Sequence, residues 1–221
     1  MNTAAIDGHQ ALAIGSIGCA VVACVALLAL HVLSPEFQPS WRMVSEYALG
    51  RHKWLITLFF AAWGVSSLVL AALLWPLVEA GWARAGVILL VVSGIGELMG
   101  GLFDVKHAAH GLAFLLGVPT LPIAALLVGY HLATLGGWDP HRGALLFASH
   151  ATWISLVLMA IAMFVMMAGF RKAGFPMGPD APVPERVPDG VIALAGYANR
   201  GLVACYLAWL MVVARAFLAV R

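Results

Sequence analysis

The sequence predicts an all-α fold: a polytopic membrane helix bundle with six transmembrane helices, forming a single domain over residues 1–221. The first reason is composition, because 63% of the residues are hydrophobic and only 10% are charged, with a mean hydropathy of +0.97. A water-soluble domain carries about 25% charged residues, so this chain cannot cover a soluble surface. The formal net charge of +2 is too even a balance to predict a nucleic-acid partner.

The second reason is that six apolar stretches are each long enough to cross a bilayer. The hydrocarbon core is about 30 Å thick, which requires about 20 residues of helix. The predicted spans lie near residues 11–33, 54–78, 84–105, 108–134, 144–170 and 190–214.

The fourth span has two features that separate it from the others. Little more than Lys106 and His107 lies between it and the third span, which predicts a tight antiparallel hairpin. Pro119 and Pro122 lie at its middle, and each removes a backbone donor. A broken helix at this depth is tolerated where the freed carbonyl groups face protein or a cavity, and together with Glu97 and Arg200 it predicts a pocket in the inner half of the membrane. The alternative is a simple kink for packing.

The basic residues predict the orientation of the bundle. Loops 34–53, 105–107 and 171–189 together carry seven lysines and arginines, whereas the opposite side carries four. Because basic residues are enriched in cytoplasmic loops, we expect the three loops in the cytoplasm and both termini outside.

Two ionisable residues lie deep within predicted spans. Glu97 is in the third span and Arg200 is in the sixth, at depths that agree within about one helical turn. An unpaired charge at that depth costs several kcal/mol, which predicts an ion pair between the two helices. Such a pair serves equally well as a staple of the bundle or as part of a polar site.

Three further residues form a candidate metal site near the predicted cytoplasmic boundary. Asp104, His107 and His110 follow one another across the break between the third and fourth spans. Carboxylate and imidazole groups are zinc ligands, so these side chains could hold a metal ion. The alternative is a solvated cap at the end of a helix.

A candidate haem site lies nearer the opposite side. His131 is near the outer end of the fourth span, and His150 is near the outer start of the fifth. These spans are antiparallel neighbours, so the two histidines could ligate a haem from both faces. The alternative is that both are interfacial or hydrogen-bonded histidines.

Three short stretches resemble the DUF998 family of six-helix bacterial membrane proteins. They are Ser45-Glu46-Tyr47-Ala48-Leu49-Gly50 before Trp54-Leu55, then Gly101-Leu102-Phe103-Asp104 before His110-Gly111-Leu112-Ala113, and then Gly196-Tyr197 with Arg200 and Trp209. The resemblance extends from about residue 31 to about residue 217. It implies a six-helix fold in the bacterial inner membrane, but no activity, because none is established for the family.

The favoured interpretation is a protein that binds or carries a lipid-like amphiphile, its partner being a membrane lipid or an amphiphilic small molecule. The predicted binding residues are Ser45, Glu97, Tyr197 and Arg200, with the Arg200 guanidinium available for a carboxylate or phosphate. The alternative is an intramembrane enzyme, acid–base or zinc-dependent, that uses Glu46, Asp104 and His110 on a lipid-like substrate. A haem electron-transfer subunit and a purely structural protein remain as further hypotheses.

Overall fold

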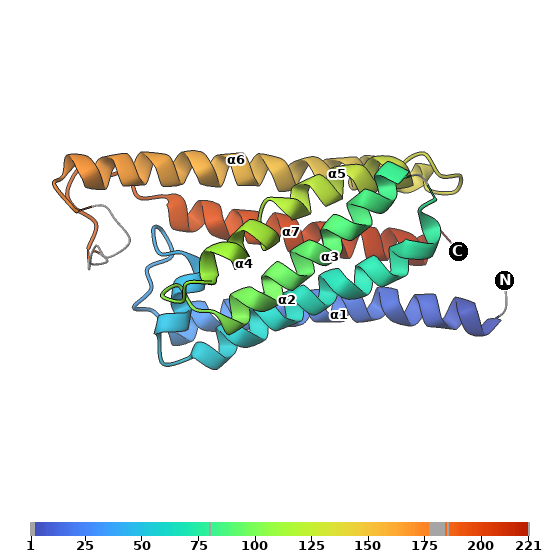
Figure 1. Ribbon diagram of the computed structural model, residues 1–221, viewed down its shortest axis with the longest axis horizontal. Coiled ribbons are helices and arrows are strands. Elements are labelled where there is room, and N and C mark those ends of the chain that lie inside the picture. Colours follow the sequence, from blue (N-terminus) through green and yellow to red (C-terminus); the bar gives the residue numbers. More distant parts are fainter. Residues whose placement is uncertain (1–2, 80, 177–183, 185, 221) are drawn as a thin grey trace.

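The computed structural model describes residues 3–79, 81–176, 184 and 186–220, and this part of the chain is helical without strands (Figure 1). Three short 3-10 helices accompany the α-helices: η1 (Val44–Leu49), η2 (Trp75–Leu77) and η3 (Asp139–His141). The α-helices are α1 (Thr3–Leu33), α2 (Lys53–Leu74), α3 (Gly81–Leu102), α4 (His110–Gly117), α5 (Thr120–Leu132), α6 (Arg142–Lys172) and α7 (Ala195–Ala219).

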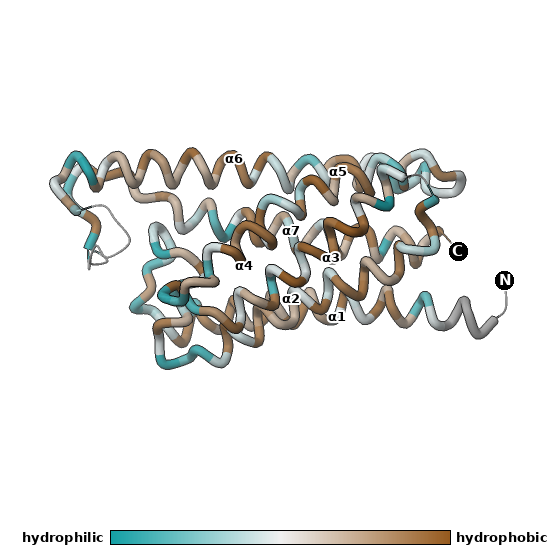
Figure 2. Tube along the Cα trace, in the orientation of Figure 1, coloured by the Kyte–Doolittle hydropathy of each residue, from teal (hydrophilic) through white to brown (hydrophobic). Residues whose placement is uncertain are grey.

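The prediction of six transmembrane helices is confirmed. Six helical segments of the described residues are long and apolar enough to cross a membrane: Gly8–Leu33, Lys53–Leu77, Gly81–Leu102, His110–Leu132, Asp139–Lys172 and Ala195–Ala219. Figure 2 shows hydrophilic residues gathered toward the two ends of the bundle and hydrophobic residues along its middle. The chain is therefore a multi-pass membrane protein.

The spans form a closed ring. Each packs on the next along the chain, and α7 completes the ring by packing on both α6 and α1. Both termini lie at one end of the bundle, while η1, the α3–α4 turn and the loop after α6 lie at the other (Figure 1). We call the latter the loop end, and it carries the candidate functional site.

The sixth span begins later than predicted. Residue 190 was its expected start, whereas α7 begins at Ala195. The reason is the backbone of Gly190, whose φ of 78° lies in the left-handed region and forms a turn rather than a helix. The first residues of α7 are then fixed by the loop before η1, because the Gly196 N–H donates to the Ser40 carbonyl oxygen at 2.9 Å.

The break in the fourth span is also confirmed, as α4 ends at Gly117 and α5 begins at Thr120. Pro122 cannot donate to the carbonyl group of Val118, and the Tyr206 hydroxyl of α7 donates to that oxygen instead, at 2.7 Å. The Gly117 carbonyl oxygen accepts from Ser93 of α3 at 2.8 Å. Side chains of neighbouring helices thus satisfy two carbonyl groups at the break, of which that of Val118 is the one deprived of its donor by Pro122.

Candidate functional site

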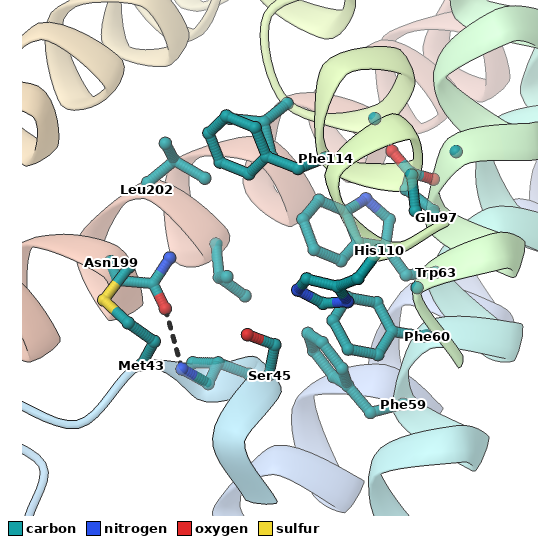
Figure 3. Close-up of a pocket in the computed structure, with 17 residues that line it drawn as sticks. Met43, Ser45, Phe59, Phe60, Trp63, Glu97, His110, Phe114, Asn199 and Leu202 are labelled. Carbon is teal, nitrogen blue, oxygen red and sulfur yellow. Dashed lines mark hydrogen bonds between the residues drawn. The ribbon is translucent and has the colours of Figure 1, made fainter. Parts of the chain in front are cut away.

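A pocket lies at the loop end between η1, α2, α3, α4 and α7 (Figure 3). Its cavity volume is about 90 Å³. Mostly apolar walls with a few polar groups are typical of small-molecule sites. The lining residues are Met43, Val44, Ser45, Phe59, Phe60, Trp63, Gly96, Glu97, Gly100, His110, Ala113, Phe114, Gly117, Val118, Asn199, Leu202 and Val203.

Glu97 lies in the pocket wall on α3, and its side chain is only 3% exposed. The hydroxyl group of Ser67 on α2 lies 2.7 Å from Glu97 Oε2, and that of Ser93 lies 2.9 Å from Oε1. No lysine or arginine of the described residues forms an ion pair with this carboxyl group. Two serines therefore hold Glu97 where the sequence predicted a guanidinium.

The predicted ion pair between Glu97 and Arg200 is accordingly wrong. The Arg200 Nε donates to His31 Nε2 at 2.6 Å and its Nη2 donates to the Tyr47 hydroxyl at 3.1 Å. Its Nη1 contacts the carbonyl oxygens of Pro39, Arg42 and Gly196 at 3.2, 2.8 and 3.0 Å. Arg200 thus clamps the loop before α2 onto α1 and α7, and it does not line the pocket.

Two other predicted residues, Ser45 and His110, do line the pocket, and both project toward its middle in Figure 3. The His110 Nδ1 lies 2.9 Å from the Phe103 carbonyl oxygen. Because a carbonyl oxygen only accepts, Nδ1 carries the hydrogen, and Nε2 is the acceptor of the uncharged ring. Tyr197, predicted beside them, is instead 57% exposed and lies outside the pocket.

The indole N–H of Trp63 is a polar group in the pocket wall with no hydrogen-bond partner. Trp63 is 3% exposed, and its Nε1 is buried and unpaired. In Figure 3 the indole nitrogen lies on the side of the ring that faces Glu97. A buried donor without an acceptor costs about 1–3 kcal/mol, so an acceptor atom that reached this nitrogen would be bound favourably.

The two predicted acid–base carboxyl groups, those of Glu46 and Asp104, lie outside the pocket lining. Glu46 accepts from the Met43 N–H at 2.6 Å and pairs with Arg42 at 3.4 Å, yet burial raises the pKa of its carboxyl group above the usual value. Asp104 accepts from Lys53 Nζ at 3.1 Å, and this hydrogen bond lowers the pKa of the aspartate. Both carboxyl groups are engaged in local structure at the loop end.

The structure does not bring together the predicted metal ligands. Asp104 binds Lys53, whereas the His107 ring stacks on Phe103 and accepts from the Ala109 N–H at 3.1 Å. Among the described residues, no three histidine, cysteine, aspartate or glutamate side chains are grouped closely enough to hold a metal ion. Asp104, His107 and His110 therefore stabilise the α3–α4 turn individually.

The two predicted haem ligands have other partners. His150 has both ring nitrogens engaged, because Nε2 contacts the Tyr130 hydroxyl at 3.0 Å and Nδ1 accepts from Trp153 Nε1 at 2.8 Å. The ring of His131 meets Trp82 edge to face at 5.5 Å. The contacts of His150 match the alternative of a hydrogen-bonded histidine near a helix end, whereas His131 Nε2 is buried without a hydrogen-bond partner.

The comparison with known families is decisive for the chain as a whole. A model of the DUF998 family, described as a protein of unknown function, matches residues 17–216. The chain belongs to the DUF998 family. No curated protein and no solved structure matches the chain significantly. All residues that line the pocket of this DUF998 protein lie within the matched range.

Several residues of the site were missed by sequence reasoning. Ser93 precedes Glu97 by four residues on the same helix, so helical spacing could have found it. Ser67 and Trp63 are on α2, and only packing places them beside Glu97. Asn199 also carried no signal, although its side-chain oxygen accepts from the Val44 N–H at 2.9 Å and fixes the rim of the pocket.

Proposed function

We propose that this DUF998 protein binds a lipid-like amphiphile in the pocket between η1 and helices α2, α3, α4 and α7. The observation that carries the proposal is the division of the pocket wall. Aromatic and aliphatic side chains such as Phe59, Phe114 and Leu202 offer an apolar surface for a hydrocarbon chain, while Ser45 and His110 offer a few polar groups for a head.

The outer face of α4 supports access from the membrane. Leu112, Phe114 and Leu115 are exposed apolar side chains on this short helix, and Phe114 also lines the pocket. Helix α4 packs mainly on α3 and lies across the pocket from α7 (Figure 3). We infer that an amphiphile enters beside α4 with its chain still in contact with lipid.

The orientation of the pocket follows from charge. The loop end carries the three loops with seven of the basic residues. By the enrichment of basic residues in cytoplasmic loops, we place the pocket in the cytoplasmic half of the membrane and both termini outside.

Filling the pocket should remove the bound amphiphile. Ala113 is buried on α4 and lines the pocket, so in Ala113→Phe the larger side chain occupies the space of the ligand. We expect lipid extracted from the purified protein and quantified by mass spectrometry to fall to background, with the helical content unchanged.

The matched control is Ala160→Phe on the exposed face of α6, which adds the same ring where it meets only lipid. That variant should retain as much lipid as the wild type. Equal retention by Ala113→Phe, in a protein that remains folded, would show that the pocket does not hold the amphiphile.

A second candidate function, chemistry on the bound amphiphile, is favoured by His110. The Phe103 carbonyl orients the ring through Nδ1, which leaves Nε2 as a base facing the pocket that Ser45 also lines. If the protein is an enzyme, lipid incubated with it changes mass over time, and His110→Gln abolishes the change without releasing the lipid. If the wild-type protein leaves the mass of the lipid unchanged, the enzyme hypothesis is refuted and binding is the function that remains.

A further inference from the structure

The chemistry of the pocket wall indicates what kind of head group it receives, an inference that rests on the proposed function. Its lining contains no lysine or arginine, and its titratable members are Glu97 and His110. The Arg200 guanidinium is bound to backbone carbonyl groups, His31 and Tyr47, and that of Arg42 pairs with Glu46. A phosphate or carboxylate head would therefore enter without a fixed positive charge to pair it.

The hydrogen bonds around Glu97 also argue against a cationic head. Ser93 Oγ lies 2.9 Å from Glu97 Oε1 and 2.8 Å from the Gly117 carbonyl oxygen, but a hydroxyl group has a single hydrogen. The carbonyl oxygen has no hydrogen to donate. With an ionised Glu97, the two acceptors would share the single Ser93 hydrogen. Each contact becomes a full hydrogen bond when the Glu97 carboxyl group carries a proton and donates it to Ser93, while Ser93 donates to Gly117. In that state Glu97 is uncharged and does not attract a cation.

The unpaired indole N–H of Trp63 indicates which atom the head group should supply. It is a buried donor in the pocket wall that needs an oxygen acceptor. When its ring is uncharged, His110 Nε2 is a hydrogen-bond acceptor in the same pocket. A hydroxyl group both accepts and donates one hydrogen bond, and it carries no charge.

We propose that the pocket selects an uncharged lipid whose head is a hydroxyl group, with Trp63 donating to the hydroxyl oxygen. Ammonium heads lack the acceptor that Trp63 requires. Phosphate heads supply an acceptor but bring a charge that no lining side chain is placed to neutralise.

Three probes with one chain and different heads test the proposal: oleyl alcohol, oleylamine and oleyl phosphate. Each is titrated into the full-length, delipidated protein in detergent at about pH 8, where an ordinary histidine is uncharged. We expect oleyl alcohol to bind at least about tenfold more tightly than the two charged probes, because the charged heads lose hydration without gaining a partner.

Two variants assign the contacts. Trp63→Phe removes the N–H and keeps an aromatic ring, and it should weaken oleyl alcohol binding by about two- to tenfold, the range of one hydrogen bond. The matched control is Trp54→Phe on the same helix, where the side chain is 63% exposed, and it should bind like the wild type. Glu97→Gln replaces the acid with an amide that can donate to Ser93 and accept from Ser67, so the ranking of the three probes should stay the same in this variant.

Each other result has a distinct meaning. A wild-type preference for oleylamine that disappears in Glu97→Gln would overturn the proposal of an uncharged head group. Glu97 would then be the counter-ion of an ammonium head, and the pocket would still be an amphiphile site. A preference for oleyl phosphate would also overturn the proposal of an uncharged head group. Failure of all three probes to bind the folded wild type would instead refute the pocket as an amphiphile site. If Trp63→Phe does not fold, the ranking of the three probes on the wild type decides alone.

Discussion

Replacing Arg200 by alanine should lower the free energy of unfolding by more than about 3 kcal/mol, because several buried acceptors would lose their donor at once. The guanidinium is the shared donor for His31 Nε2, the Tyr47 hydroxyl and the carbonyl groups of Pro39, Arg42 and Gly196. Each acceptor that is left buried and unpaired costs about 1–3 kcal/mol. The loop before α2, which forms the rim of the pocket, should therefore detach from α7.

The measurement is chemical unfolding of the purified protein in detergent, followed by circular dichroism. Arg200→Lys keeps the charge but not the planar fork, so it should recover little of the loss. Arg215→Ala on the exposed side of the same helix should unfold like the wild type. Wild-type stability of Arg200→Ala with loss of bound amphiphile would restore the guanidinium as the ligand residue that the sequence predicted.

Arg200 also shows where sequence reasoning reached its limit. Composition and apolar run length predicted six spans, because a bilayer imposes a length on every helix that crosses it. The depth of a residue in the membrane can also be estimated from its position along a helix, and this estimate placed Glu97 and Arg200 at similar depths. Rotation about each helix axis is not readable from one sequence. It directs Arg200 toward His31 and Tyr47 and directs Glu97 toward Ser67, so equal depth did not make a pair.

The residues of the candidate site were predicted only in part, because position along the chain is readable from sequence and the direction of a side chain is not. Ser45, Glu97 and His110 line one pocket because each lies near the loop end, a property that position along the chain reveals. Asp104 and Glu46 lie near that end as well, yet Lys53 and Arg42 take up their charges locally. The unpaired N–H of Trp63 left no trace in the sequence, since a tryptophan in an apolar span is ordinary and only the packed structure shows that its donor has no acceptor.

Gly96→Ala should be the second strongly destabilising change, because it forces apart α3 and α4 where their backbones meet. A Cβ atom on Gly96 would lie 2.6 Å from the Leu116 carbonyl carbon and 2.7 Å from the Gly117 Cα, and it would also meet the Gly117 nitrogen. Backbone atoms cannot rotate away as a side chain does. We expect α4 to shift, with loss of the hydrogen bond from Ser93 to the Gly117 carbonyl oxygen.

The expected loss is about 2–4 kcal/mol in the free energy of unfolding, from overpacking and the broken hydrogen bond. The higher helix propensity of alanine offsets only about 1 kcal/mol of it. Gly111→Ala on α4 is the matched control, because a Cβ there meets nothing within 4 Å, and the propensity gain should leave it neutral or slightly stabilised. Equal unfolding curves for the two variants would contradict the close approach of α3 and α4. A destabilised Gly96→Ala that also loses bound amphiphile would link this helix contact to the shape of the pocket, since Gly96, Gly117 and Glu97 all line it.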